Sequence, residues 1–244
     1  MKLTVRGAVA AIFILGMCAL CVRLGFWQLD RLEQRRARNA SIRAATVQPP
    51  LRLDSAAPAA LTSDPRSFMW RRAEARGRYH HAGDMVVRGR SREGRPGVHL
   101  VSPLVLADGR VVMVNRGWVP SPDGTTADVR PLRVDGPVRV SGALLPITSD
   151  ADRGLPFAGR AGTDSTWRRV DLAQAQARAP GPVIPLVLQQ LPAQGGDAGS
   201  PPLPEPLPAL SEGNHLSYAV QWFSFATIGV IGLAILLLRH RKAA

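Results

Sequence analysis

Cysteine is scarce in this sequence: the 244 residues include two, Cys18 and Cys21, and both lie in one apolar stretch near the N-terminus. The rest of the chain cannot form disulfides, so its fold must depend on packing, which is compatible with a periplasmic location but does not require one. Cys18 and Cys21 form a C-x-x-C pair without the following histidine of a c-type haem site. The pair is either two small buried side chains or a soft-metal site.

Lysine is almost absent as well. Lys2 and Lys242 are the only two, although the formal net charge is +13. The positive charge is therefore carried by arginines, which bind carboxylates and phosphates bidentately and are suited to membrane interfaces. These arginines are scattered along the chain rather than gathered on one helix, which disfavours a nucleic-acid partner.

Catalytic signatures are missing too. The sequence has no H-E-x-x-H, no G-x-S-x-G and no phosphate-binding glycine loop. The five histidines are His80, His81, His99, His215 and His240. His80 and His81, with Asp84 nearby, have the residue types of a metal site, but neighbouring residues of a strand point to opposite faces. We therefore do not expect an enzyme.

Two long apolar segments stand near the ends of the chain. The first is uncharged over residues 7–22 and continues beyond Arg23, and it predicts a transmembrane helix over residues 7–29. A cleaved signal peptide is the alternative, but no small-x-small cleavage site is present. The second predicts a transmembrane helix over residues 215–238, which contain no Asp, Glu, Lys or Arg.

The basic residues around these helices predict the topology. They occur on the terminal side of both helices, in residues 1–6 and 239–244, so we expect both termini in the cytoplasm. Arginines after the first helix oppose that assignment, but they begin a long domain, whose charge has little influence on orientation. We expect a multi-pass protein of the bacterial inner membrane with a periplasmic central domain, because no presequence typical of mitochondrial import precedes the first helix.

The helical pattern continues past the first apolar segment as a juxtamembrane helix over residues 30–47. Trp27, Gln28, Arg31 and Arg35 share one face at helical spacing. Two interpretations stay open. The arginines either lie among lipid head groups or form a polar stripe near a bound ligand.

The central part, residues 48–191, has the pattern of a β-rich domain. Residues 98–107 and 110–115 flank an Asp-Gly turn and form the clearest hairpin, after a loop at residues 92–97. Further strands are predicted at residues 70–79, 84–90, 138–145, 166–170 and 183–190. Gly77 predicts a bulge, and Pro103 predicts an edge or a kink.

A short helix and a linker complete the chain. Asp171 and Gln174 predict a capping box for a helix that ends at Arg178. Residues 192–214 are rich in Pro and Gly and predict an extended, poorly ordered linker. The predicted fold is a membrane protein with two transmembrane α-helices that flank an antiparallel β-rich domain, barrel-like or sandwich-like, with a short helix.

Two sites combine polar and aromatic residues. Arg116 and Trp118 end the predicted hairpin, where they either cap a strand or bind a flat anionic ligand by charge and stacking. His215 precedes the second apolar helix. An imidazole in this place is either an axial haem ligand or an interfacial residue without a ligand.

Three segments taken in order carry a family resemblance. They read LGFWQLDR at residues 24–31, VNRGWVP at residues 114–120 and HLSYAVQWF at residues 215–223. Together they resemble the surfeit-locus family of cytochrome c oxidase assembly factors, over nearly the whole chain. Residues 146–165 and 192–210 match no feature of that family and are expected to be variable insertions.

The resemblance implies a protein that assists oxidase biogenesis, binds haem a and helps to insert it into the catalytic subunit. The implied partners are that subunit, the machinery of haem a synthesis and the lipid bilayer. The candidate ligand of the haem iron is His215, and the other expected cofactor-binding residues are Trp27, Gln28, Arg31, Arg116, Trp118, Tyr218 and Trp222. We infer that Arg31 or Arg116 pairs with a haem propionate. The alternative is a membrane-anchored scaffold that stabilises oxidase subunits without binding haem.

Overall fold

The computed structural model describes residues 5–54, 59–147, 166–192 and 199–242. The chain divides into two compact units, residues 1–41 with 209–244 and residues 42–208. The described elements, in chain order, are α1 (Val5–Thr46), β1 (Leu51–Arg52), α2 (Ala60–Ser63), η1 (Pro65–Phe68), β2 (Arg72–Tyr79), η2 (His81–Gly83), β3 (Met85–Arg92), β4 (Arg95–Leu106), β5 (Val111–Pro120), η3 (Arg130–Leu132), β6 (Pro137–Pro146), β7 (Thr166–Trp167), α3 (Leu172–Arg178), β8 (Val183–Gln190) and α4 (His215–Lys242).

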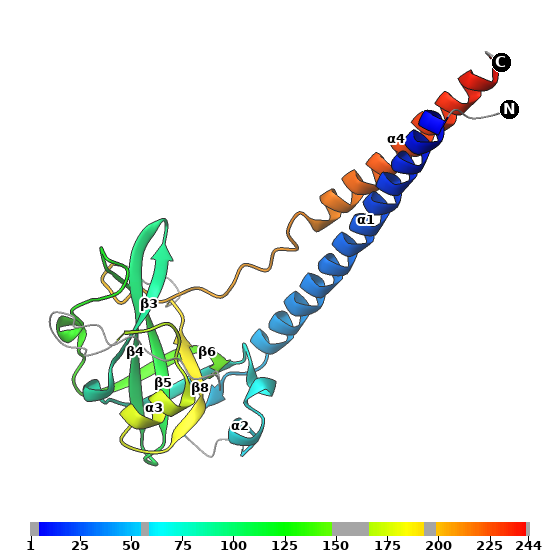
Figure 1. Ribbon diagram of the computed structural model, residues 1–244. Coiled ribbons are helices and arrows are strands. Elements are labelled where there is room, and N and C mark those ends of the chain that lie inside the picture. The colour runs from blue at the N-terminus through cyan, green and yellow to red at the C-terminus, as the bar shows by residue number, and fades with distance from the viewer. Residues whose placement is uncertain (1–4, 55–58, 148–165, 193–198, 243–244) are drawn as a thin grey trace. The chain divides into compact units, whose positions relative to one another are not determined.

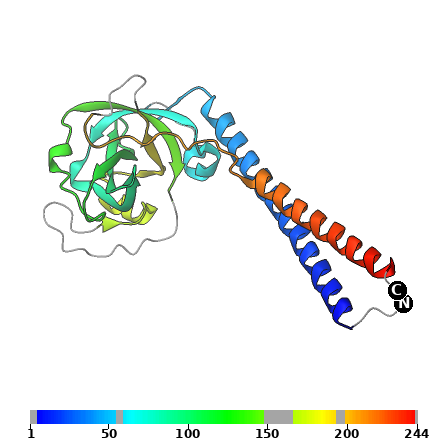
Figure 2. The ribbon, with the colours of Figure 1, turned by 90° about the horizontal axis from the view of Figure 1, so that it is seen from above.

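The first unit is a pair of antiparallel helices. Figures 1 and 2 show α1 and α4 side by side, with the start of α1 and the end of α4 at the same end of the pair. Each helix has an apolar window long enough to cross a membrane, with mean hydropathy 2.3 in Gly7–Thr46 and 2.0 in His215–Arg239. Only 17% and 6% of these windows are buried within the protein, as expected for helices that contact lipid. α1 also contains the predicted juxtamembrane helix, because it runs unbroken to Thr46.

Small residues bring the two helices close together. A Cβ atom added to Gly25 would lie 2.6 Å from the ring of Phe223, and one added to Gly229 would lie 2.6 Å from Cys18 Sγ. Cys18 and Cys21 are buried in this contact as free thiols. The two cysteines therefore pack as small buried side chains between the helices, and the soft-metal interpretation of the C-x-x-C pair is not tested by this contact.

The second unit contains a closed β-barrel. Among the described strands, pairing runs β2–β6–β8–β5–β4, and β4 pairs back with β2, so five strands form a ring. Figure 2 shows the strands curving around the core. The predicted β-rich barrel is confirmed. One pair in the ring, β5 with β8, is parallel rather than antiparallel, because the chain passes through β6, β7 and α3 before it returns as β8.

Alternate residues of the barrel strands face its interior, as the two-residue period of a strand requires. This core contains Ala73, Ala75, Leu104, Leu106, Val112, Val114, Val140, Leu144, Ile184, Leu186 and Leu188. On the outer face of β5, Met113 is buried with Ala175 of α3, so this helix covers part of the sheet. Asp171 begins α3 by accepting a hydrogen bond from the backbone N–H of Gln174 at 2.8 Å, as the predicted cap requires.

Residues 92–97 differ from the predicted loop. β3 and β4 continue until Arg92 pairs with Arg95, across a two-residue turn at Glu93 and Gly94. Both turn residues have positive φ, 52° and 76°, which suits the right-handed twist of a hairpin. The turn was missed because Glu is uncommon at the first of these positions, where Asn or Asp is the usual signal.

Residues 203–205 of the proline-rich segment before α4 are more ordered than predicted. Leu203 exchanges two backbone hydrogen bonds with Trp118, of 2.8 and 2.7 Å. The Pro204 carbonyl accepts a hydrogen bond from Arg92 at 3.2 Å. We call residues 203–205 the strap, because they bind along the barrel. Composition alone did not predict the strap, since its pairing partner is far away in the sequence.

Candidate functional site

The first turn of α4 places His215 against Gln28 of α1. Nδ1 of the imidazole lies 2.8 Å from Oε1 of the amide. An amide oxygen only accepts hydrogen bonds, so Nδ1 carries the proton and a neutral ring keeps its lone pair on Nε2. Among the described residues, none forms a hydrogen bond with Nε2. His215 therefore presents a free nitrogen of the kind that ligates a metal or a haem iron.

Arginines of α1 surround the histidine. A depression of about 300 Å³ is lined by Arg31, Gln34, Arg35, Arg38 and His215. Arg31 donates a hydrogen bond to Gln34 Oε1 at 3.0 Å. Within the described part of the chain, no carboxylate lies within ion-pairing distance of Arg31, Arg35 or Arg38. The depression is therefore a positively charged surface that suits an anion.

Trp27 lies next to this depression. The guanidinium carbon of Arg31 is 5.8 Å from the centroid of the Trp27 ring, and that ring is 50% exposed. Trp27 also lines a second depression, of about 540 Å³, with Arg23, Leu24, Phe26 and Asp30. The structure thus brings together four of the predicted site residues: Trp27, Gln28, Arg31 and His215.

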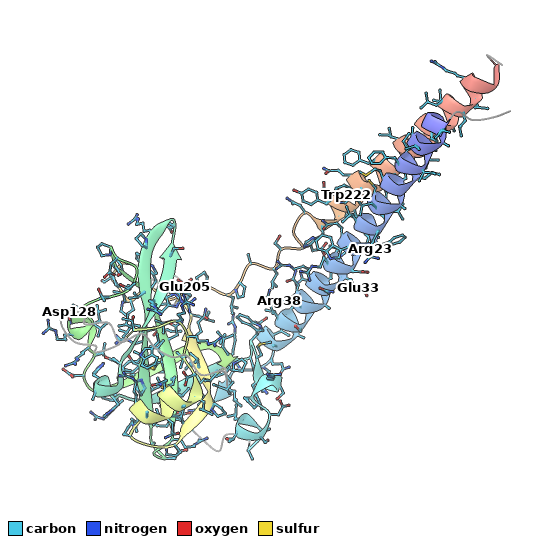
Figure 3. All side chains as sticks on the ribbon, in the orientation of Figure 1. Arg23, Glu33, Arg38, Asp128, Glu205 and Trp222 are labelled. Atoms are coloured by element: carbon cyan, nitrogen blue, oxygen red, sulfur yellow. The ribbon has the colours of Figure 1, made fainter. Side chains whose placement is uncertain are left out.

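Tyr218 and Trp222 lie further along α4, one and two turns from His215. Tyr218 is 48% exposed. Trp222 of α4, labelled in Figure 3, packs against the buried cluster of Cys18, Cys21 and Ala226 between the two helices. Among the described contacts, none joins either residue to His215. Their predicted role in binding the cofactor stays a prediction, and Trp222 has a clear role in packing the helices.

Polar contacts hold the chain before α4 against α1. Arg36 pairs with Glu212 at 3.0 Å, which raises the pKa of the Arg36 guanidinium. Asn39 is buried and donates a hydrogen bond to the Ser211 carbonyl at 3.2 Å. These residues help to position His215 three residues later. No local pattern in the sequence predicts these two contacts, because the residues of each pair are more than 170 positions apart.

Arg116 and Trp118 lie in the barrel unit, where both are buried. The Arg116 guanidinium donates to the Leu132 carbonyl at 2.6 Å and stacks over the Tyr79 ring, 4.9 Å from its centroid. Burial lowers the pKa of Arg116 and raises that of Tyr79 to about 12. Trp118 pairs with Leu203 of the strap. The Arg116 side chain therefore packs inside the barrel unit, while Trp118 is joined to the strap through its backbone. The predicted contact of both residues with a haem stays a prediction.

His81 was considered as a metal ligand with His80 and Asp84. Its two ring nitrogens are both engaged: Nδ1 lies 3.1 Å from Asp84 Oδ2, and Nε2 accepts from the Val134 N–H at 3.1 Å. Within the described residues, no group of three or more His, Cys, Asp or Glu side chains is placed to hold a metal ion. His81 is thus a structural residue at the start of η2.

His99 joins the strap to β4. Asn115 Nδ2 lies 3.2 Å from its Nδ1, and Glu205 Oε1 lies 3.4 Å from its Nε2. Burial, together with the positive charge of Arg90, lowers the pKa of His99 below its ordinary 6.5, while Glu205 opposes this change. Burial and Arg90 outweigh Glu205, so the surroundings of His99 favour the neutral ring near pH 7.

The His99 contact predicts a dependence of stability on pH. Because its pKa is lower in the folded barrel than in the unfolded chain, the stability that it contributes is present above about pH 6.5 and is lost as the pH falls below that value. The free energy of unfolding, measured with denaturant, should decline from pH 7.5 to pH 5.5, and this decline should be smaller in His99→Gln. If the free energy of unfolding falls equally with pH in the two proteins, the protonation of His99 is not coupled to folding.

The fold and the site define a class: a β-barrel protein with two helices able to span a membrane, and with a histidine and arginines gathered where the second of these helices begins. The SURF1 family model matches residues 15–227, most of the chain, so the protein belongs to the SURF1 family. This family is linked to the assembly of cytochrome c oxidase and is a family of assembly factors rather than a known family of enzymes.

Individual relatives agree with this assignment. An uncharacterized SURF1-like protein of Mycobacterium tuberculosis is 28% identical over 224 residues, which are 91% of this chain and 80% of that protein. A SURF1-like protein of Monosiga brevicollis is 28% identical over 90% of this chain and 83% of its own length. A SURF1-like protein of Rickettsia felis is 25% identical over 91% of this chain and 92% of its own.

Proposed function

We propose that this protein binds haem a and assists its insertion into the catalytic subunit of cytochrome c oxidase. The observation that carries the proposal is the free Nε2 of His215, oriented by Gln28 and set beside arginines without a described carboxylate partner. The family assignment supplies the process, oxidase assembly. The haem itself is our inference from the residues and from the family resemblance.

The side chains around the depression suit this cofactor in their chemistry. When bound, haem a would supply an iron that a histidine nitrogen can ligate and propionates that can pair with cations. His215 offers the nitrogen, and Gln28 keeps the proton on the opposite side of the ring. Arg31 offers a cation in the same depression, and the exposed ring of Trp27 offers a flat apolar surface beside it.

A site with a single histidine favours transfer of the haem over its permanent storage. His215 is half-buried in the first turn of α4, and no second histidine lines the described depression. A single axial ligand holds iron less firmly than two, so the cofactor remains transferable to a partner with a better site. We therefore propose a carrier without a catalytic step of its own.

We also propose where the protein works. Basic residues precede the apolar part of α1 and follow that of α4, and this distribution favours both termini in the cytoplasm of a bacterial inner membrane. The barrel unit would then be periplasmic. Its proposed partners are the oxidase catalytic subunit and the machinery that makes haem a.

The absorption spectrum of the purified full chain tests the proposal. Protein isolated from cells that make haem a is expected to show haem bands, and His215→Ala is expected to lose them. His80→Ala, which removes a half-buried histidine of the barrel, serves as the control and should keep them. Bands that survive in His215→Ala would show that His215 is not the ligand. Oxidase subunits that copurify with an unmodified protein without haem bands would support the scaffold alternative.

A further inference from the structure

Three arginines on one face of α1 carry more positive charge than the two propionates of a haem require. Arg31, Arg35 and Arg38 are spaced i, i+4 and i+7, so they are stacked along one side of the helix, and all three line the depression at His215. This surface is independent of the barrel, because all of its residues belong to the unit formed by α1 and α4.

The acidic residues of the same segment do not neutralise this face. Glu33 and Arg38 are about 140° apart around the helix axis, and Figure 3 shows them on different sides of α1. Neither Asp30 nor Glu33 pairs with one of the three arginines in the described structure. The fourth arginine, Arg36, is engaged by Glu212. The three-arginine face is therefore available to an external anion.

The position of this face matches the head-group layer of a bilayer. His215, which precedes the uncharged part of α4, is level with Gln28 through their hydrogen bond. Arg31 lies one turn beyond Gln28, so its rise along the axis is only about 4.5 Å. Arg35 is one further turn away. Trp27 precedes Gln28 in α1, toward the apolar segment. An aromatic ring is typical of the depth at which a helix leaves the hydrocarbon core of a membrane.

A second, mostly apolar depression adjoins the charged one. Leu24, Phe26 and Trp27 line it together with Arg23 and Asp30, on the side of α1 that leads toward the apolar segment. Arg31 links the two, because its guanidinium lies over the Trp27 ring while it also lines the charged depression. A phosphate bound to the arginines would thus have an apolar surface beside it, where a hydrocarbon chain can lie.

We propose that Arg31, Arg35 and Arg38 bind the phosphate of an acidic phospholipid, whose acyl chain lies against Leu24, Phe26 and Trp27. Guanidinium groups bind phosphate oxygens by bidentate, charge-assisted hydrogen bonds, and cations at the membrane surface are attracted to anionic lipids. The proposal does not depend on haem binding. Arg31 is shared with the proposed cofactor site, so a bound lipid and a haem propionate compete for it.

Native mass spectrometry of the full chain, purified in detergent without haem a, tests the proposal. Phosphatidylglycerol is expected to remain bound in preference to phosphatidylcholine with the same acyl chains. Arg35→Gln should weaken phosphatidylglycerol binding about fivefold, as expected for the loss of one cation at a membrane surface. Arg36→Gln is the matched control, because it removes the same charge from the neighbouring position but from a residue already paired with Glu212. Arg35→Lys should bind with intermediate affinity, because the charge remains and the bidentate contact is lost.

Three results would overturn the proposal. Both lipids carry one phosphate, so equal binding would show that the net negative charge of the phosphatidylglycerol head group is not recognised. An equal loss in Arg35→Gln and Arg36→Gln would show a general effect of net charge. Displacement of phosphatidylglycerol by equimolar inorganic phosphate would show a simple anion site without an acyl-chain contribution. Haem spectra enter none of these comparisons, so a failure here leaves the proposed function standing, and the reverse also holds.

Discussion

Cells whose only copy of this protein carries His215→Ala are expected to assemble little cytochrome c oxidase with haem a. The substitution removes the one ring nitrogen that is oriented by Gln28 and free to ligate iron. Loss of a residue that merely orients a metal ligand costs about 10–100-fold in affinity, and loss of the ligand itself should cost more. The measurement is the haem a content and oxidase activity of the membranes.

Gln28→Leu provides a graded comparison for this prediction. It keeps the imidazole but removes the acceptor of the Nδ1 proton, so the decrease in haem affinity should be about 10–100-fold. His80→Ala should leave the oxidase unchanged. Normal oxidase levels in His215→Ala, with the variant protein present in the membrane, would contradict a role for His215 in delivering haem.

Gly77→Val is expected to destabilise the barrel severely, by more than about 3 kcal/mol. Gly77 lies where β2 pairs with Val138 of β6 on one side and with Leu106 of β4 on the other, which is the seam that closes the ring. A Cβ added at Gly77 would collide with the backbone carbonyl oxygen of Val105. Backbone cannot yield as a flexible side chain can, so the seam must open or shift.

Thermal unfolding of the full chain measures this effect. Gly199→Ala is the matched control, because it adds one methyl group in the same unit and an added Cβ there meets no atom within 4 Å. Gly77→Val should lower the unfolding temperature strongly, while Gly199→Ala should leave it nearly unchanged. Similar unfolding temperatures for Gly77→Val and the unmodified protein would mean that the barrel does not close at this position.

The sequence predicted those parts of the barrel that depend on local signals. The Asp-Gly hairpin, the strand Val183–Gln190 and the Asp171 cap each rest on residues within a few positions of one another. Closure of the ring by β2 and β4, and the parallel pairing of β5 with β8, depend on contacts between distant strands. Neither hydrophobic alternation nor turn residues specify which distant strands become neighbours.

Pro103 shows how context can override a local rule. A proline in the middle of the long strand β4 predicted an edge or a kink. In the barrel, Pro103 pairs with Met113 on one side, and on the other it lies where the neighbour of β4 changes from β3 to β2. A backbone N–H is not needed at that change of partner. Gly77, predicted as a bulge, instead lies at the seam that the two strands share.

The candidate site was predicted in part. The spacing of Trp27, Gln28 and Arg31 placed them on one face of a helix, and the apolar segments placed His215 at a similar level. The hydrogen bond that orients His215 was not predictable, because it joins residues 187 positions apart. Arg116 and Trp118 were indistinguishable from ligand-binding residues in the sequence, and only the barrel shows that both are buried.

If Nε2 of His215 ligates a haem iron, as we claim, free imidazole should rescue haem binding in a variant that lacks the histidine side chain. His215→Gly purified from cells that make haem a should lack the haem bands of the unmodified protein. Added imidazole, which supplies the missing nitrogen in the space left by the side chain, should restore them. Full haem bands in His215→Gly without imidazole, or no haem bands in the unmodified protein, would contradict the claim.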